Sequence, residues 1–226
     1  MNSPRRFLVV FDLDGTLVDS ARDLADSGNA LLRSYGAPPL PAADVVAMVG
    51  DGARELVARL LDAAAVRVPV NHALARFLAL YDTRLTATTR PYDGVVEMLA
   101  SVAQNARMAI LTNKPERSTL KMLEALNLRQ PFADVIGGDG KWPRKPDPEG
   151  LRALMIRADV GPGQTLMVGD SPADLHAAIG AGVPMCLVRY GFGFAKVTPE
   201  DRARAAHEVD HPSGISAAVA RVTSTL

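Results

Sequence analysis

Three short apolar runs, each ending in a polar residue, constrain the fold of this chain more than any other feature. They are FLVVFD at residues 7–12, MAILT at residues 108–112 and TLMVGD at residues 165–170. Short apolar runs without polar alternation are typical of strands buried on both faces of a parallel sheet. Apolar segments at residues 135–136 and 185–188 predict two further strands.

Helical patterns with caps separate these strands, at residues 93–105, 115–127 and 148–158. Each parallel crossover needs a connecting element, so strands that alternate with helices predict a parallel sheet covered on both faces. About five strands are too few for a TIM barrel, which has eight. The expected fold class is therefore α/β, with a Rossmann-like parallel sheet.

Residues 19–90 interrupt this alternation. The segment contains no good strand pattern, but it carries apolar residues at helical spacing. Gly36 before two prolines ends one helix, the sequence GDG at residues 50–52 makes a tight turn, and Arg90-Pro91 returns the chain to the sheet. We expect a core formed by residues 1–18 and 91–226, with an all-helical insertion at residues 19–90.

The composition of the 226 residues excludes several classes of protein. Lys plus Arg and Asp plus Glu both number 25, so the net charge is zero and no bulk field favours nucleic acid or an anionic membrane. The single cysteine, Cys186, excludes an intrachain disulfide and argues against a cysteine-based zinc site. No apolar run approaches the roughly 18 residues of a membrane span. We expect a cytoplasmic protein without nucleic-acid or membrane partners; monomer or homodimer stays open.

Two aspartates, Asp12 and Asp14, follow the first predicted strand in DLDGTLVDS, residues 12–20. Ligands of doubly wound sheets bind beyond the carboxyl ends of the strands. Residues i and i+2 that leave a strand point to the same side, so one carboxylate can attack while the other moves protons. Gly15 would let the backbone turn closely around a bound anion. The alternative interpretation is an Asx turn with solvated acids.

Polar residues follow the other strands as well. Thr112 and Asn113 offer a hydroxyl and amide N–H groups at a helix N-terminus, which can bind an anion. Asp170 ends the strand TLMVGD, and Asp174 lies one helical turn later. Taken singly, these residues are ordinary helix caps and first-turn acids. Their convergence at one edge of the inferred sheet, beside the first aspartate pair, favours a site.

Several carboxylates in one place cannot all stay ionised without a cation. Acidic oxygen ligands without His or Cys select a hard ion, and Mg²⁺ is the expected one. A positive side chain should also reach the site, and the candidate is Lys145 in RKPDP, residues 144–148. A solvated surface lysine is the alternative interpretation.

Four ordered motifs resemble those of the haloacid dehalogenase-like hydrolase superfamily: DLDGTLVDS, LTNKP, GGDG followed by RKPDP, and VGDSPAD. They span nearly the whole chain. The insertion after the first motif resembles that superfamily's small helical cap. TNKP, the VIGGD that precedes KPDP, and VGDGA at residues 49–53 are most similar to the phosphoglycolate phosphatase branch.

This resemblance implies catalytic roles. Asp12 would be the nucleophile that forms an aspartyl-phosphate, and Asp14 the general acid and then the base for the hydrolytic water. Thr112 and the amide of Asn113 would hold phosphoryl oxygens, and Lys145 would neutralise charge and orient the nucleophile. The sequence places each of these residue types at the position that the motifs require.

The resemblance also implies ligands and substrate contacts. Mg²⁺ would be held by Asp12, the backbone carbonyl of Asp14, and Asp170, with Asp174 as support behind them. Thr16 and Asn113 would contact substrate. In the cap, Gly50, Gly52 and Arg54 would form the specificity turn, with Arg54 as a partner for a substrate carboxylate. The alternative interpretation of Arg54 is a solvated helix residue. Asp51 differs from the family pattern, in which this turn often carries a neutral residue.

The expected function is Mg²⁺-dependent hydrolysis of a small phosphomonoester, most specifically 2-phosphoglycolate. A phosphatase of another sugar or nucleotide phosphate and a phosphomutase are compatible with the same motifs. Asp14 argues against a haloacid dehalogenase, and the absence of lysine from residues 19–90 argues against a phosphonatase. A non-catalytic phosphate-binding regulatory protein is the alternative of a different class, and it would tolerate loss of Asp12 or Asp14, whereas both are present.

Overall fold

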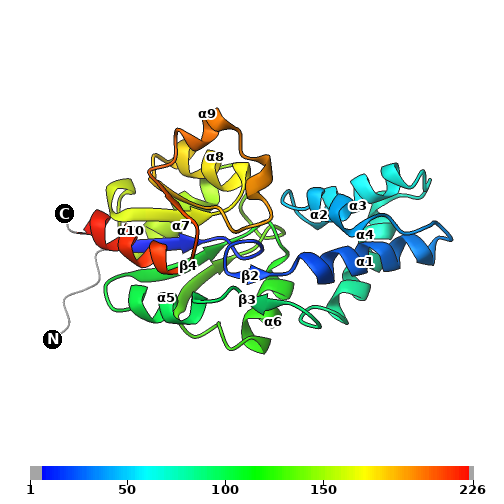
Figure 1. The fold of residues 1–226 in the computed structure, drawn as a ribbon, viewed down its shortest axis with the longest axis horizontal. Helices are drawn as coiled ribbons and strands as arrows, with labels where there is room; N and C mark the ends of the chain where they lie inside the picture. Colours follow the sequence, from blue (N-terminus) through cyan, green and yellow to red (C-terminus); the bar gives the residue numbers. More distant parts are fainter. Residues whose placement is uncertain (1–6, 224–226) are drawn as a thin grey trace.

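The structure, a computed structural model, describes residues 7–223. Its centre is a parallel sheet with helices on both faces, and a group of four helices lies beyond one end of the sheet (Figure 1). Within the described residues the sheet has six strands in the order β5-β4-β1-β6-β7-β8. They are β1 (Leu8–Phe11), β4 (Arg107–Leu111), β5 (Phe132–Ile136), β6 (Thr165–Gly169), β7 (Met185–Val188) and β8 (His207–Val209). The predicted Rossmann-like α/β fold is confirmed.

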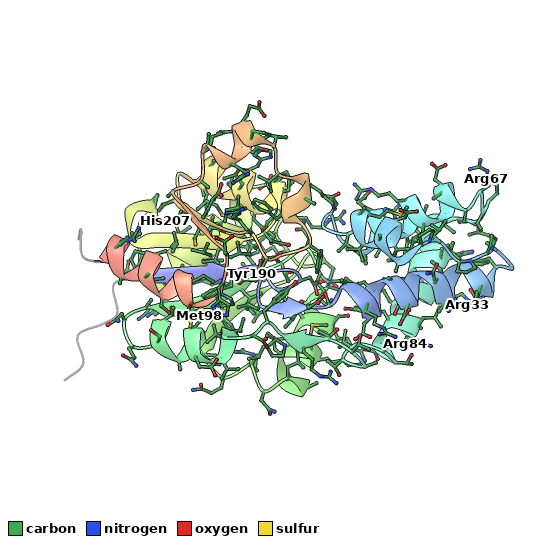
Figure 2. The ribbon with its side chains drawn as sticks, viewed as in Figure 1. Arg33, Arg67, Arg84, Met98, Tyr190 and His207 are labelled. Atoms are coloured by element: carbon green, nitrogen blue, oxygen red, sulfur yellow. The ribbon has the colours of Figure 1, made fainter. Side chains whose placement is uncertain are left out.

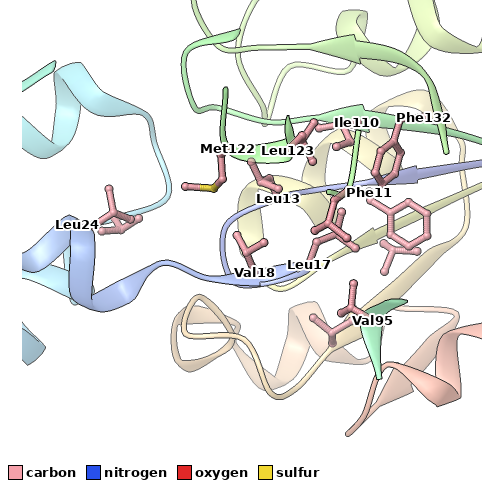
Figure 3. Packing of buried hydrophobic residues seen from close by; sticks show 14 of the residues in the cluster. Phe11, Leu13, Leu17, Val18, Leu24, Val95, Ile110, Met122, Leu123 and Phe132 are labelled. Atoms are coloured by element: carbon pink, nitrogen blue, oxygen red, sulfur yellow. The ribbon is translucent and has the colours of Figure 1, made fainter. Parts of the chain in front are cut away.

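Alternate residues of the strands face two apolar layers, because successive side chains of a strand point to opposite faces. Val9 and Phe11 of β1 pack in the layer with α5 (Val95–Val102), α6 (Glu116–Ala125) and α10 (Ser213–Thr223). Leu8 and Val10 pack in the other layer, with α7 (Glu149–Ala158) and α8 (Pro172–Ala181). Figure 3 shows the first layer, where the rings of Phe11 and Phe132 meet edge to face with centroids 6.2 Å apart.

The described part of the core also contains three short helical elements. They are two single 3₁₀ turns, η1 (Pro162–Gln164) and η2 (Phe194–Lys196), and the one-turn helix α9 (Pro199–Arg202). Within residues 7–223, no helix combines the length and the apolar character that crossing a membrane would require.

The inserted segment forms four helices, α1 (Ala21–Ser34), α2 (Ala42–Ala47), α3 (Ala53–Ala63) and α4 (Val70–Asp82). Their apolar faces meet one another, with Leu31, Leu60 and Phe77 fully buried. We call these helices the cap. A two-stranded antiparallel ribbon, β2 (Val18–Asp19) with β3 (Arg90–Pro91), joins the cap to the core, and the predicted boundaries at 18/19 and 90/91 fall inside this ribbon.

The sequence analysis missed three strands. It expected about five strands and none within residues 19–90, whereas the structure has β8 at the sheet edge and the ribbon of β2 and β3. The physical reason is length and polarity. β8 is three residues long and includes His207 and Glu208, and each ribbon strand has only two residues, so none shows an apolar run.

The topology places a binding crevice at the ends of three strands. Numbered within the sheet alone, the strands follow the order 3-2-1-4-5-6 of a doubly wound fold, and the direction of winding reverses beside β1. Ligands of such sheets bind outside the carboxyl ends of the strands at this reversal. The crevice therefore lies beyond β1, β4 and β6, which is the side on which the cap sits (Figure 1).

A buried carboxylate fastens the start of the cap to its end. Asp23, in the first turn of α1, accepts hydrogen bonds from the backbone N–H and hydroxyl groups of Thr88 and Thr89, at 2.7–3.1 Å. Burial by itself would raise the pKa of Asp23, but these hydrogen bonds outweigh it and the pKa is lowered. The ionised carboxylate thus holds the first turn of α1 against the segment that leads from the cap into β3.

Asp23→Asn should lower the free energy of unfolding by about 2 kcal/mol at pH 7, because the amide NH₂ would face backbone donors. The folded-state pKa of Asp23 lies below its unfolded value, so its stabilisation is present above the unfolded pKa of about 3.9 and disappears as pH falls through the folded value. Urea unfolding of both proteins across this range tests the account, with Asp26→Asn on the same helix as control. If the difference in free energy of unfolding between the wild-type protein and Asp23→Asn does not decrease as the pH is lowered, the account is contradicted.

Candidate active site

Three buried carboxylates meet at the carboxyl end of the sheet. Asp12 directly follows β1, Asp170 directly follows β6, and Asp174 lies in the first turn of α8. One oxygen from each lies within 4.8 Å of the others, and the three residues are 8%, 1% and 0% exposed. We call this group the aspartate cluster. The predicted convergence of residues from separate strand ends is therefore present in the structure.

Lys145 is the cation that faces this cluster. Its Nζ lies 2.8 Å from Asp12 Oδ1 and 2.6 Å from Asp174 Oδ1. Burial alone would lower the pKa of Lys145, but the charges of Asp12 and Asp174 outweigh burial and raise the pKa. The lysine therefore stays protonated as a fixed positive charge, in contrast to the solvated surface lysine that was the alternative.

The cluster carries more negative charge than Lys145 balances. Burial, reinforced by the charges of Asp174 and Asp14, raises the pKa of Asp12 to about 6 against the opposing effect of Lys145. Burial, reinforced by Asp174 and Asp12, also raises the pKa of Asp170 well above its ordinary value. A bound cation would relieve this repulsion. All-oxygen, carboxylate donors suit a hard divalent ion, so the residues fit a metal site.

Asp174 is already engaged on both oxygens. Oδ1 accepts from Lys145, and Oδ2 accepts from the backbone N–H and the hydroxyl of Ser171 at 3.0 and 2.6 Å. Ser171 in turn caps the N-terminus of α8 through the backbone N–H of Asp174. Asp174 therefore supports the lysine and the helix start. Asp170 is engaged less fully, because its Oδ2 accepts the backbone N–H of Gly193 at 2.7 Å whereas the Thr16 hydroxyl lies 3.5 Å from its Oδ1. Asp12 and Asp170 are therefore the carboxylates expected to bind a metal.

Gly15 and Thr16 pack against Asp170 and do not face the crevice directly. Gly15 has φ +86°, and a Cβ there would lie 2.1 Å from Asp170 Oδ2, so only glycine leaves room for this carboxylate. The Thr16 hydroxyl lies 3.5 Å from Asp170 Oδ1. Gly15 thus makes room for a carboxylate and not for the anion expected from the sequence. Thr16, a predicted substrate contact, is absent from the pocket lining described below.

Thr112 and Asn113 follow β4, and both are nearly buried. The Thr112 hydroxyl oxygen accepts the backbone N–H of Lys114 at 3.3 Å, so its own proton can be donated elsewhere. The side-chain amide of Asn113 donates to the carbonyl of Lys145 at 2.8 Å and to that of Gly50 at 3.0 Å. Asn113 therefore positions the lysine loop and the cap turn.

Asp14 points to a second lysine that the sequence analysis did not assign. Both of its oxygens lie 3.1 Å from Lys114 Nζ, and Oδ1 also accepts the hydroxyl of Ser20 at 2.6 Å. Lys114 Nζ donates to the hydroxyl of Tyr81, a residue of the cap, at 2.5 Å. The only sequence signals for Lys114 and Ser20 were their places in TNKP and DLDGTLVDS, and none assigned Tyr81 to the site.

A pocket lies between the cap and the core, above these residues. The core contributes polar side chains and the cap contributes a mainly apolar wall. Its lining consists of Asp12, Asp14, Leu24, Val49, Gly50, Gly52, Ala53, Leu56, Phe77, Leu78, Tyr81, Thr112, Asn113, Lys114, Pro115, Asp170, Ser171, Phe192 and Gly193. The predicted turn residues Gly50 and Gly52 therefore do face the site.

Arg54 does not reach this pocket. It is exposed on α3, and its guanidinium donates to the side chain of Asn71 on α4. Leu56 lines the pocket, and a residue two positions earlier on a helix points about 200° away. The expectation that Arg54 meets a substrate carboxylate therefore has no support in the structure, which instead gives the alternative of a solvated helix residue.

The cap turn is held to the core by three donors. Lys196, Asn113 and Arg144 donate to the successive backbone carbonyls of Val49, Gly50 and Asp51, the last at 2.8 Å. The Asp51 carboxylate is paired with Arg59 of the cap. This pairing removes the repulsion that an unpaired Asp51 would exert on an anionic substrate.

The comparisons with known proteins agree with this geometry. The family model described as haloacid dehalogenase-like hydrolase matches residues 9–188. The chain belongs to this family. Phosphoglycolate phosphatase of Rhodospirillum rubrum is 43% identical over 81% of this chain and 80% of its own length. The corresponding protein of Cupriavidus necator, described as phosphoglycolate phosphatase, plasmid, is 40% identical over 81% of each chain.

A solved structure shows the same fold. The crystal structure of "a predicted phosphoglycolate phosphatase" from Haemophilus somnus has a TM-score of 0.85 and 29% identity, and the match covers 93% of this chain and 96% of that one. With the family assignment, these relatives place the chain in the phosphoglycolate phosphatase-like branch, and it is a phosphoric monoester hydrolase.

Arg144→Ala should loosen the cap turn, because it removes one of the three donors and the weaker contact of Arg144 with Glu55. Hydrogen exchange at the amides of residues 50–52 should become several-fold faster, while exchange within α1 and α4 stays unchanged. Arg157→Ala, which removes a surface pair with Asp134, serves as control. Unchanged exchange at the turn would show that Arg144 does not hold it.

Proposed function

We propose that the protein hydrolyses 2-phosphoglycolate in a Mg²⁺-dependent reaction that passes through a phosphoenzyme on Asp12. The observation that carries this proposal is the position of the Asp12 carboxylate. It lines the pocket between cap and core, pairs with the buried Lys145, and lies in a cluster of three buried carboxylates. An anionic nucleophile needs such surroundings to approach a dianionic phosphate.

In the first step an Asp12 oxygen attacks phosphorus, and the bond from phosphorus to the substrate's ester oxygen breaks. Asp14 gives its proton to that oxygen, so glycolate leaves as an alcohol. The hydroxyl of Thr112 and the backbone N–H of Asn113 donate to phosphoryl oxygens. Lys145 keeps Asp12 oriented and offsets the charge on the phosphoryl group.

In the second step water attacks the phosphorus of the aspartyl-phosphate. Asp14, now ionised, takes a proton from this water, and the bond between phosphorus and the Asp12 oxygen breaks. Inorganic phosphate is released, and Asp12 returns as a carboxylate. Both oxygens of Asp14 lie 3.1 Å from Lys114 Nζ, and this contact keeps the carboxyl group directed at the same point in both steps.

Asp12, Asp170 and the backbone carbonyl of Asp14 would hold the Mg²⁺ ion. When bound, the ion supplies positive charge that balances the carboxylates and stabilises the charge on the phosphoryl group. Asp174 contributes indirectly, since both of its oxygens hold Lys145 and Ser171 in place.

The cap wall favours a short leaving group. Its pocket-lining side chains include Leu24, Leu56, Phe77 and Leu78, and Tyr81 is the only polar one among the described residues. Sugar or nucleoside hydroxyls placed against this wall would lose their hydrogen bonds to water without replacement, which costs free energy. The two-carbon leaving group of 2-phosphoglycolate places no hydroxyl against this wall, and its carboxylate is the one group that needs a partner in the pocket. The names of the relatives support the same substrate.

Asp12→Asn should abolish turnover of 2-phosphoglycolate while leaving the fold intact, because it removes the attacking charge without changing volume. Steady-state rates and a thermal unfolding curve measure the two effects, with Asp134→Asn at the surface as control. Residual activity above about a hundredth of the wild-type rate would contradict the role of Asp12 as nucleophile.

Mg²⁺ should raise the melting temperature of the wild-type protein, because an ion that binds only the folded cluster stabilises it by mass action. Asp170→Asn should lose most of this rise, since it removes one of the two carboxylates proposed to hold the ion. Thermal unfolding with and without millimolar Mg²⁺ tests this prediction. If Mg²⁺ raises the melting temperature of Asp170→Asn as much as that of the wild-type protein, the ion binds elsewhere.

A further inference from the structure

Lys114 is the only lysine or arginine among the described residues that line the pocket. Its side chain is 3% exposed, and its position follows from β4, whose end carries Thr112, Asn113 and Lys114 in succession. A buried ammonium group is costly unless anions or hydrogen-bond acceptors surround it. Both oxygens of Asp14 and the hydroxyl of Tyr81 surround the Lys114 ammonium group. Lys114 therefore places an ammonium group inside the pocket.

The other cations near the site are directed elsewhere. Lys145 is bound by Asp12 and Asp174 beneath the pocket. Arg54 is bound to Asn71, and Figure 2 shows Arg33 and Arg67 at the end of the cap away from the core. Arg144 and Lys196 donate to backbone carbonyls of the cap turn. Among the described residues that line the pocket, Lys114 is therefore the cation that can meet a second negative charge of the substrate.

Tyr81, on helix α4 of the cap, contacts Lys114 through both its hydroxyl and its ring. Its hydroxyl oxygen accepts from Lys114, and Lys114 Nζ lies 4.5 Å from the centre of its ring. The ring stacks on Phe77 at 5.8 Å, which fixes the side chain. Burial raises the pKa of Tyr81 to about 12 against the opposing charge of Lys114. The hydroxyl therefore keeps its proton and can donate it to an anion beside Lys114.

The proposed reaction brings a substrate carboxylate to this position. The leaving oxygen must come within hydrogen-bond distance of Asp14 to receive its proton. Lys114 Nζ lies 3.1 Å from both oxygens of Asp14. In 2-phosphoglycolate a single CH₂ separates the leaving oxygen from the carboxylate, so this carboxylate falls within ion-pair reach of Lys114.

We infer that Lys114, assisted by the Tyr81 hydroxyl, binds the leaving-group carboxylate and selects phosphomonoesters that carry one. This inference rests on the proposed function. In the TNKP motif, Thr112 and Asn113 would then contact the phosphoryl group, and Lys114 would contact the leaving group. The inference also explains how substrate binding engages core and cap together, because the two side chains come from the two parts of the molecule.

The test compares 2-phosphoglycolate with ethyl phosphate, in which a methyl group replaces the carboxylate. Lys114→Met should lower kcat/KM for 2-phosphoglycolate at least about tenfold more than for ethyl phosphate, mainly through KM, while any loss common to both substrates reflects the contact of Lys114 with Asp14. Lys114→Arg should keep most of the preference because it keeps the charge. Lys121→Met is the matched control, since Lys121 also joins core to cap, through Asp82, but at the surface.

Equal losses on both substrates in Lys114→Met would mean that Lys114 acts only by positioning Asp14, and would overturn the inference. If this variant does not fold, Tyr81→Phe decides. Its loss of one donor should lower kcat/KM for 2-phosphoglycolate by about tenfold with little effect on ethyl phosphate, and equal losses would again overturn the inference. A wild-type protein that hydrolyses ethyl phosphate but does not prefer 2-phosphoglycolate would instead refute the proposed substrate, and the inference with it.

Discussion

The crowding of negative charge at one edge of the sheet is the constraint on which the site depends. Asp12, Asp170 and Asp174 are buried within a few ångströms of one another, and the ammonium group of Lys145 is bound to Asp12 and Asp174. Isolated buried carboxylates would be protonated and chemically inert. The lysine and a bound divalent ion would together allow Asp12 to remain an anion, which the proposed attack on phosphorus requires.

The fold divides the work between its two parts. The core holds the groups proposed to act on phosphorus, because β1, β4 and β6 end side by side at the reversal of the sheet. The cap supplies an apolar wall and one tyrosine hydroxyl, which are proposed to contact the leaving group. Donors from the core hold the carbonyls of residues 49–51, and the cap wall and Asp12 line the same pocket.

The core and its carboxylates could be predicted from sequence because they depend on local patterns. A buried strand ends where its apolar run ends, so Asp12 and Asp170 had to reach the same edge. Lys114 and Tyr81 meet only after the cap has packed on the core, and no local pattern encodes that contact. The motif alone left two interpretations of Arg54 open, and in the structure its guanidinium faces Asn71 outside the pocket, since it lies two positions before Leu56 on α3. The strands β2, β3 and β8 were too short to give a pattern.

The most direct test of this account is a crystal structure of the protein with Mg²⁺ and beryllium trifluoride, which mimics a phosphoryl group bound to a carboxylate. The account predicts beryllium bonded to an Asp12 oxygen, with its fluorides facing the Thr112 hydroxyl and the Lys145 ammonium group, and the metal shared by Asp12 and Asp170. Beryllium bonded to any other side chain, or a metal that does not touch Asp170, would contradict it.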